Sequence, residues 1–201
     1  MRDRLYIDDT RLRIRQGHPW VYDNQVLRFE GRPHPGGIVQ VFDVKKGPLG
    51  QGFFNPKSKI RVRMLTKDLD EPIDPGFFHR KIEAAWNFRK HMGQPESCRV
   101  VFGEADGLPA LVVDKFNDIL VLQTLALGMD RFKVEIVQAL REVLKPRGIY
   151  ERNDVPVREK EGLDQVKGFV GAEFDTRLTI EENGLRFAVD VAEGQKTGYF
   201  L

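Results

Sequence analysis

Glycine and proline break the first third of the chain into short apolar runs, which leaves no room for long helices there. The apolar runs cover residues 38–42, 49–54 and 60–65, and turn-forming residues stand at 31–37, 46–48 and 55–56. Short strands at close spacing, separated by such turns, are typical of a small β-barrel. The sequence therefore predicts an all-β domain over residues 1–70.

The charges are divided unevenly between this region and the rest of the chain. Residues 1–67 hold 14 Lys and Arg against 6 Asp and Glu, a net charge of +8. The remaining residues hold 18 against 24, a net charge of −6, so the total of +2 hides the asymmetry. A basic module beside an acidic body favours a nucleic acid as the partner. Excess charge acquired by chance is the alternative explanation.

Arginines alternate with apolar residues in two places of the basic region. Arg61 and Arg63 lie two apart in one apolar run, so a strand there would project both from one face. Arg11, Arg13 and Arg15 show the same spacing and predict a second strand. Two such strands would form a phosphate-binding surface. An ordinary solvated strand face explains either pattern equally well.

The rest of the chain mixes helices and strands. Asp74-Pro75 is a helix start, with Asp as the N-cap and Pro at the first helical position, and predicts a helix to His91. The further predictions are a hairpin of strands 108–116 and 119–125, a helix over 130–144, a strand at 149–152 and a hairpin over 178–191 turning at 183–184. We expect an α+β fold, with a central domain of strand-strand-helix-strand-strand over residues 71–177 and a C-terminal hairpin segment over 178–201.

Few residues suggest chemistry on their own. No glycine loop for a nucleotide and no metal-ligand spacing of histidines are present, so no metal is expected. Cys98 is either a nucleophile or a packing residue. Glu104 and Asp106 are either a carboxylate pair or part of a turn. The polar segment 151–162 is either a functional loop or a salt-bridged one.

The longest apolar stretch is far too short to cross a membrane. Residues 119–127 include Gln123 and Thr124, whereas a span needs about 20 apolar residues. The N-terminus also lacks the apolar segment of a secretory signal. We therefore expect a cytoplasmic protein with no membrane partner.

Several separate blocks of the sequence, in order, resemble one known family. The blocks are Gly17-His18-Pro19-Trp20, residues 52–63, residues 103–109, residues 151–162 and residues 182–201. They are similar to the large-subunit ribosomal RNA 5-methylcytosine methyltransferases. The first two blocks resemble the PUA domain of that family and the next two its central domain. The last block, with Gly194-Gln195-Lys196-Thr197-Gly198, resembles the segment that leads into the S-adenosylmethionine-binding domain.

The resemblance implies a function and a set of site residues. It implies RNA, and ribosomal RNA in particular, as the substrate and S-adenosylmethionine as the cofactor of the complete enzyme. The RNA-binding residues would be Arg13, Arg15, His18, Trp20, Lys57, Lys59, Arg61, Arg63, Arg152, Asn153 and Arg158. The residues at the edge of the cofactor pocket would be Gln195, Lys196, Thr197 and Phe200. Cys98 does not match the catalytic position of the family, so no catalytic residue is expected in the chain.

Members of that family continue beyond the final Leu with Asp-Gln-Arg and a Rossmann-like catalytic domain, which this sequence does not contain. We therefore expect a truncated chain that binds RNA, holds no cofactor and is inactive alone. A naturally short RNA-binding adaptor is the alternative. An RNA-modifying enzyme of another reaction class is a third option, against which the C-terminal block argues. The apolar end Tyr199-Phe200-Leu201 leaves a homodimer open.

Overall fold

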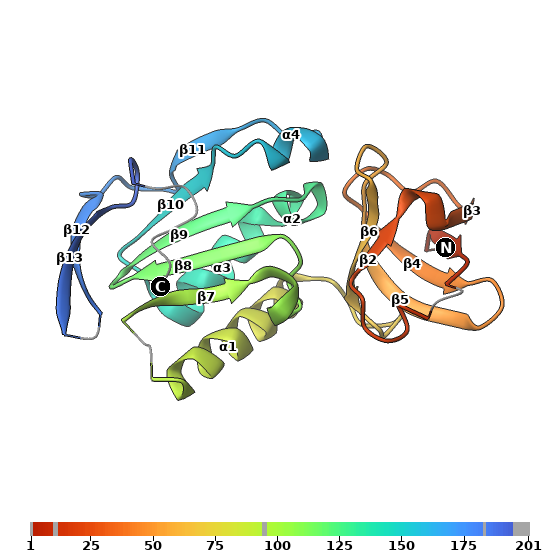
Figure 1. Cartoon of the computed structure of the whole chain (residues 1–201), viewed down its shortest axis with the longest axis horizontal. Coiled ribbons are helices and arrows are strands. Elements are labelled where there is room, and N and C mark those ends of the chain that lie inside the picture. Colours follow the sequence, from red (N-terminus) through yellow and green to blue (C-terminus); the bar gives the residue numbers. More distant parts are fainter. Residues whose placement is uncertain (1, 10–11, 94–95, 183, 195–201) are drawn as a thin grey trace.

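The chain folds into a β-barrel and a layered α/β unit, which lie side by side along the longest axis of the molecule (Figure 1). The computed structural model describes residues 2–9, 12–93, 96–182 and 184–194. A hairpin at the far side of the α/β unit ends the described part (Figure 1).

The N-terminal unit is a curved sheet of six strands in the order β2-β6-β5-β4-β1-β3. The strands are β1 (Arg4–Ile7), β2 (Trp20–Tyr22), β3 (Val26–Glu30), β4 (Ile38–Asp43), β5 (Gly47–Phe54) and β6 (Ile60–Thr66), with a short 3-10 turn, η1 (Asp23–Gln25). Alternate side chains point inward and form a core that includes Leu5, Val21, Val41 and Val62. The predicted all-β character of this region is confirmed; β1, β2 and β3 were not predicted.

The strand predicted around Arg11 to Arg15 is wrong. Residues 13–17 form a turn, closed by hydrogen bonds from Gln16 N to Leu12 O at 2.9 Å and from Gly17 N to Ile14 O at 3.0 Å. The turn places the Ile14 side chain in the barrel core, where it is 3% exposed, and leaves Arg13 and Arg15 outside. The alternating pattern in the sequence therefore comes from one buried apolar residue, Ile14, between two exposed arginines.

The predicted first helix is confirmed as α1 (Pro75–His91). The Asp74 side chain accepts a hydrogen bond from Phe77 N at 2.9 Å, which satisfies one of the free amides of the first turn. The helix buries Phe77, Phe78 and Ile82 against the sheet of the α/β unit.

The second sheet has the order β11-β10-β9-β8-β7 and is antiparallel except for the parallel pair β9–β10. Its strands are β7 (Ser97–Phe102), β8 (Leu111–Phe116), β9 (Ile119–Thr124), β10 (Gly148–Asn153) and β11 (Val166–Phe169). Central β9 is buried throughout: Leu120 and Leu122 join the helix-side core, while Ile119 and Val121 join the core beneath the terminal hairpin. This confirms the central strand that its apolar sequence predicted.

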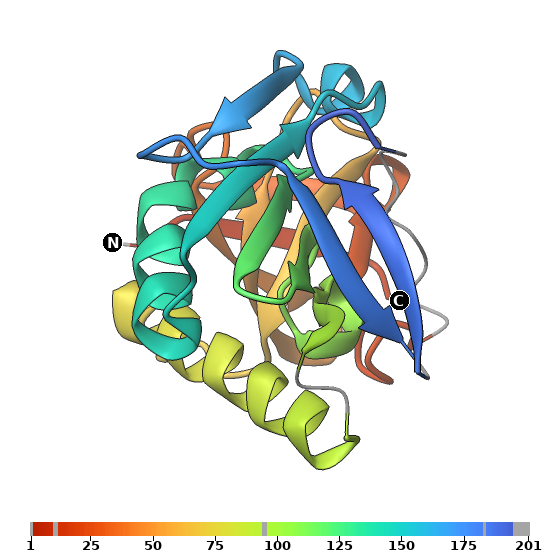
Figure 2. The same cartoon turned by 90° about the vertical axis from the view of Figure 1, so that its left-hand side faces the viewer.

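The predicted helix 130–144 differs from the structure. It begins earlier, as α2 (Leu127–Arg131), and α3 (Lys133–Leu144) follows after a break at Phe132 (φ −95°, ψ 18°). The break lets the Phe132 ring pack on Phe78 of α1 and Phe53 of β5, with centroids 5.1 and 5.7 Å away. Helices α1 and α3 pack side by side on one face of the sheet (Figure 2).

The other face of the sheet carries the hairpin of β12 (Arg177–Glu182) and β13 (Leu185–Asp190), which runs in front of it in Figure 2. Ile180 and Val191 pack there with Ile119 and Tyr150. The hairpin itself is confirmed, but the turn predicted at Asn183-Gly184 lies partly outside the described residues.

The barrel and the α/β unit share apolar packing. Phe53 of β5 and Leu65 of β6 point away from the barrel interior and belong to the core of the α/β unit. Gly128 of α2 lies against the Phe53 ring so closely that an added Cβ would stand 2.2 Å from its Cγ. This contact therefore fixes the position of the barrel relative to the α/β unit.

We expect Gly128→Ala to loosen this contact and lower the free energy of unfolding by about 1–3 kcal/mol, because the methyl group overpacks the junction. Urea denaturation measures the change. Val134→Ala removes a side chain that is 76% exposed on α3 and is the control, with an expected change below about 0.5 kcal/mol. Equal stability of Gly128→Ala and the control would contradict the rigid junction.

Candidate nucleic-acid interface

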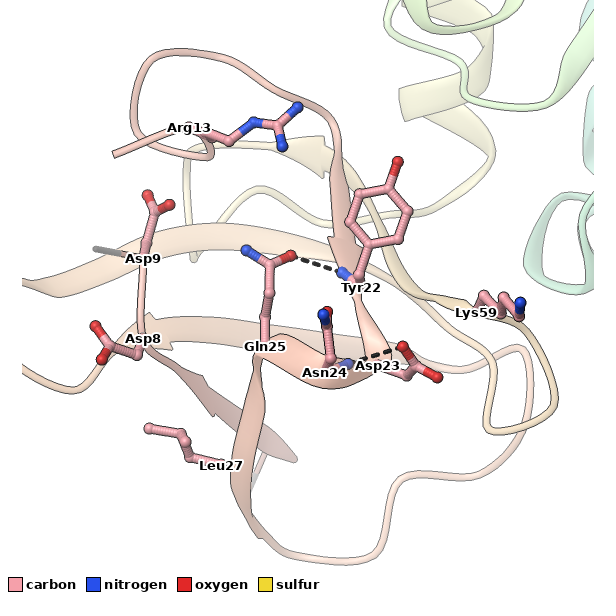
Figure 3. Close-up of a pocket in the computed structure, with 9 residues that line it drawn as sticks. All are labelled: Asp8, Asp9, Arg13, Tyr22, Asp23, Asn24, Gln25, Leu27 and Lys59. Atoms are coloured by element: carbon pink, nitrogen blue, oxygen red, sulfur yellow. Dashed lines mark hydrogen bonds between the residues drawn. The ribbon is translucent and has the colours of Figure 1, made fainter. Parts of the chain in front are cut away.

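Three exposed cations of the barrel are used by no group among the described residues. Arg13 comes from the turn after β1, and Lys57 and Lys59 come from the loop between β5 and β6. All three are exposed, and their side chains have no hydrogen-bond or ion-pair partner among the described residues. Arg13 and Lys59 line the same pocket although 46 positions separate them (Figure 3). Three of the residues predicted to bind RNA are thus free to bind an anion.

Two other predicted RNA-binding arginines brace the turns that carry these cations. The guanidinium of Arg15 donates from Nη2 to Lys46 O at 2.8 Å. The guanidinium of Arg61 donates to the carbonyl oxygens of Asn55 and Pro56 and so fixes the loop before β6. Arg15 is exposed and Arg61 half-exposed, so both still add positive charge to this face.

An aromatic row borders the cations. His18, Trp20 and Tyr22 alternate along and just before β2, so their rings share one side of the strand. The His18–Trp20 and Trp20–Tyr22 ring centroids are 5.8 and 6.4 Å apart, both edge to face. All three residues are half-buried. Half-exposed rings beside free cations are the combination that stacks bases and binds phosphates.

A pocket of about 660 Å³ opens on one side of this row (Figure 3). Its lining residues come from the segment after β1, from β2, η1 and β3, and from the β5–β6 loop: Asp8, Asp9, Arg13, Tyr22, Asp23, Asn24, Gln25, Leu27 and Lys59. A second pocket of about 320 Å³ includes His18 and Lys67 at the opposite end of the row. The sequence predictions missed Tyr22, Asn24 and Gln25. These residues line the same pocket as Arg13 only because the chain folds η1 back beside the segment that follows β1.

The next cluster is buried at the junction of the two units, around Glu161 of α4 (Val157–Glu161). Glu161 Oε1 accepts hydrogen bonds from Ser58 Oγ at 2.6 Å and from Arg63 Nη2 at 3.1 Å, and Oε2 accepts one from Asn55 Nδ2 at 2.8 Å. Arg63 and Glu161 are 8% and 3% exposed. A charged pair this well buried is stable only when its remaining polar groups are also satisfied.

A second carboxylate completes the junction from the short turn η2 (Gly103–Asp106). Glu104 Oε1 accepts from Trp20 Nε1 at 2.7 Å and from Arg63 Nη1 at 3.4 Å. Asp106 accepts instead from Arg89 Nη2 and from Phe102 N, at 2.8 and 2.6 Å. Glu104 and Asp106 are therefore two structural acceptors with different partners, as the turn alternative held.

Another buried cluster holds the carboxyl end of the central strands together. The guanidinium of Arg158 donates to Thr124 O and to Asp130 Oδ1, the latter at 2.9 Å. Asn153 Oδ1 accepts from Thr124 N at 2.8 Å. Burial opposes the charge of Asp130, but the hydrogen bonds from Arg158 and Thr124 outweigh it and lower the pKa of the Asp130 carboxyl below its ordinary 3.8.

Arg152 fastens the last described residues to the sheet. Its Nη1 donates to Val191 O at 3.0 Å and to Gly194 O at 3.1 Å, and its Nε donates to Asp154 at 3.2 Å. The residues predicted to border a cofactor, Gln195, Lys196, Thr197 and Phe200, follow directly and lie outside the described residues.

The prediction that four further side chains contact RNA is corrected. Arg63, Arg152, Asn153 and Arg158 are between 0% and 8% exposed, and each makes hydrogen bonds to protein partners, although the buried Nε of Arg63 has none among the described residues. These polar residues are present in the sequence because they form ion pairs and hydrogen bonds inside the protein, and they do not form a polar surface. The salt-bridged alternative for segment 151–162 is therefore the correct one.

Other candidate chemistry is structural as well. Cys98 is 1% exposed, and burial raises the pKa of its thiol, which disfavours a nucleophilic thiolate. Within the described ranges, no group of three His, Cys, Asp or Glu residues could hold a metal ion. No helix in the part of the chain that the structure describes is long and apolar enough to span a membrane.

Part of the barrel matches a known domain family, and most of the chain aligns with known proteins. Residues 10–67 match the PUA-like domain family. This match covers the barrel face described above. Over 191 residues the chain is 40% identical to a ribosomal RNA large subunit methyltransferase I from Alteromonas mediterranea, and over 188 residues it is 39% identical to the protein of that name from Shigella dysenteriae. These alignments cover 94% and 92% of this chain but 48% and 47% of the relatives.

Two solved structures share the fold. The structure of "a putative sam-dependent methyltransferase from Streptococcus mutans" superposes with a TM-score of 0.77 at 17% identity, over 96% of this chain and 50% of that one. The structure of "a putative methyltransferase complexed with SAH" also gives 0.77, at 16% identity, over 97% of this chain and 49% of that one. The chain thus spans about half the length of the proteins it matches.

We expect Glu161→Ala to lower the free energy of unfolding by about 3–5 kcal/mol, because it leaves the buried Arg63 charge without its closest partner. Chemical denaturation measures the loss. Glu159→Ala removes an exposed carboxylate from the same helix and is the matched control, with a change of about 0.5 kcal/mol or less. A loss as small as that of the control would contradict the junction described here.

The lowered pKa of Asp130 predicts an acid dependence. Its stabilising contribution is complete above the ordinary pKa of the carboxyl and is lost as the pH falls through the lowered folded pKa. We expect Asp130→Asn to be less stable at neutral pH and to lose less stability than the parent on acidification. Urea curves at several pH values measure this, with exposed Asp164→Asn as control. A constant difference between parent and Asp130→Asn down to the most acidic pH would refute the assignment.

Proposed function

We propose that this chain is the RNA-binding and substrate-positioning part of an S-adenosylmethionine-dependent methyltransferase that acts on ribosomal RNA, at carbon 5 of cytosine. The observation that carries the proposal is the coincidence of the PUA-like match with the free cations Arg13, Lys57 and Lys59 beside the aromatic row. Work on ribosomal RNA would place the protein in the cytoplasm.

The relatives support an enzyme rather than an adaptor. Similarity to methyltransferases extends through the barrel, the α/β unit and the hairpin, over 94% of the chain. An adaptor that reuses the same two domains would give the same alignment, but the relatives reported above are named as methyltransferases. Methyl transfer itself is proposed to lie in the half of the relatives that this chain does not match, because the single cysteine, Cys98, is buried.

The described residues contribute binding and orientation. Phosphates would contact the cations of the barrel face, and unstacked bases would contact the aromatic row. The Glu161–Arg63 pair and the Phe53 contact fix that face relative to the α/β unit. Arg152 holds the segment that enters residues 195–201, where the cofactor-contacting residues are proposed to lie. RNA held on the barrel would thus be held at a set distance from the cofactor.

The proposal is tested by the salt dependence of RNA binding, measured by fluorescence anisotropy with a short single-stranded RNA. Contacts from three cations to phosphate imply a slope of about −2 in log K against log salt. Replacing both Lys57 and Lys59 by Ala should reduce the slope to about −0.7 and weaken binding about tenfold at low salt.

The matched control replaces two exposed cations elsewhere, Lys90 at the end of α1 and Arg186 on β13, which gives the same change in net charge. This variant should keep the slope and nearly all of the affinity. Equal weakening by both double variants would mean that net charge, not the barrel face, binds RNA. A flat salt curve for the parent chain would overturn the proposal.

A further inference from the structure

The pocket beside Tyr22 contains polar groups that the protein leaves unused. Gln25 Oε1 accepts from Tyr22 N at 2.8 Å, so its Nε2 faces the pocket without a hydrogen-bond partner among the described residues. The Asn24 amide is exposed and likewise has no side-chain partner within the described ranges. Figure 3 shows Asn24, Gln25 and Tyr22 rising from η1 and β2 toward the guanidinium of Arg13.

Asp9 adds a buried acceptor to the pocket wall. It is 2% exposed, yet its Oδ1 has no hydrogen-bond partner among the described residues. Its position is fixed, since Asp9 N donates to Asp43 Oδ2 at 2.8 Å and Asp9 Oδ2 accepts from Arg15 N at 3.2 Å. A buried carboxylate oxygen without a donor is unfavourable, and a ligand N–H would satisfy it.

We propose that this pocket receives one unpaired nucleobase that bears an exocyclic amino group, in preference to uracil. The inference rests on the proposed function, because it requires that RNA reach the barrel face. Tyr22 would stack on the base, and the carboxylate of Asp9 would accept its amino protons. Arg13 and Lys59, at the rim, would hold the adjoining phosphates.

The charges of the lining decide which part of a nucleotide enters. Three carboxylates, Asp8, Asp9 and Asp23, line the pocket and would repel a phosphate, whereas both cations stand at its edge (Figure 3). A carboxylate accepts from the exocyclic amino group of adenine, cytosine or guanine, whereas uracil has a carbonyl oxygen at that position and offers only its N3–H as a donor. The pocket volume of about 660 Å³ has room for one nucleotide.

The test compares binding of short oligocytidine, oligoadenosine and oligouridine by fluorescence anisotropy at one salt concentration. The parent chain should bind the first two about tenfold more tightly than oligouridine. Asp9→Asn should weaken oligocytidine and oligoadenosine, reduce the preference to about twofold or less, and leave oligouridine nearly unchanged. Lys59→Ala is the control and should weaken all three equally, because it contacts phosphate.

Asn24→Ala is a second variant, useful if Asp9→Asn does not fold, because its side chain is exposed. The side-chain oxygen of Asn24 lines the same pocket and would accept an amino proton of the base, so its removal should reduce the preference about threefold. Equal binding of all three oligonucleotides by the parent, or an unchanged preference in the folded variants, would overturn the inference while leaving the RNA-binding function intact. Failure of the parent to bind any of the three would overturn the proposed function together with the inference.

Discussion

The carboxylate of Glu161 is the interaction on which the arrangement of the molecule depends. It lies at the end of a five-residue helix in one unit and accepts hydrogen bonds from Asn55, Ser58 and Arg63 in the other. These three residues belong to β6 and to the loop before it, which also carries Lys57 and Lys59. The contact that joins the two units thereby fixes the loop that presents the free cations.

This arrangement divides the basic residues of the barrel into two groups. Arg63 is desolvated and paired, which suits a planar guanidinium that can reach Glu161 and Glu104 at once. Lys57, Lys59 and Arg13 stay solvated and unpaired among the described residues. The net charge of +8 in the first 67 residues is therefore not all available to a ligand. Of the part that is available, Arg13 and Lys59 line the pocket beside Tyr22.

Local patterns in the sequence were enough to predict the elements whose signals are local. Asp74-Pro75 starts α1, and the apolar run of β9 lies buried between two layers. The surface status of arginines was not predictable in the same way, because Arg63, Arg152 and Arg158 are buried by carboxylates and carbonyls distant in sequence. The turn at residues 13–17 was missed because the buried Ile14 stands between two exposed arginines, and this spacing is also typical of a β-strand.

The central proposal is that RNA lies on the barrel face between the turn at residues 13–17 and the loop before β6. Hydrogen–deuterium exchange of the chain with and without single-stranded RNA tests it most directly. We expect slower exchange for the amides of residues 13–25 and 55–61, with little change in α1 and α3. Protection confined to α1, α3 or the β12–β13 hairpin would contradict the claim.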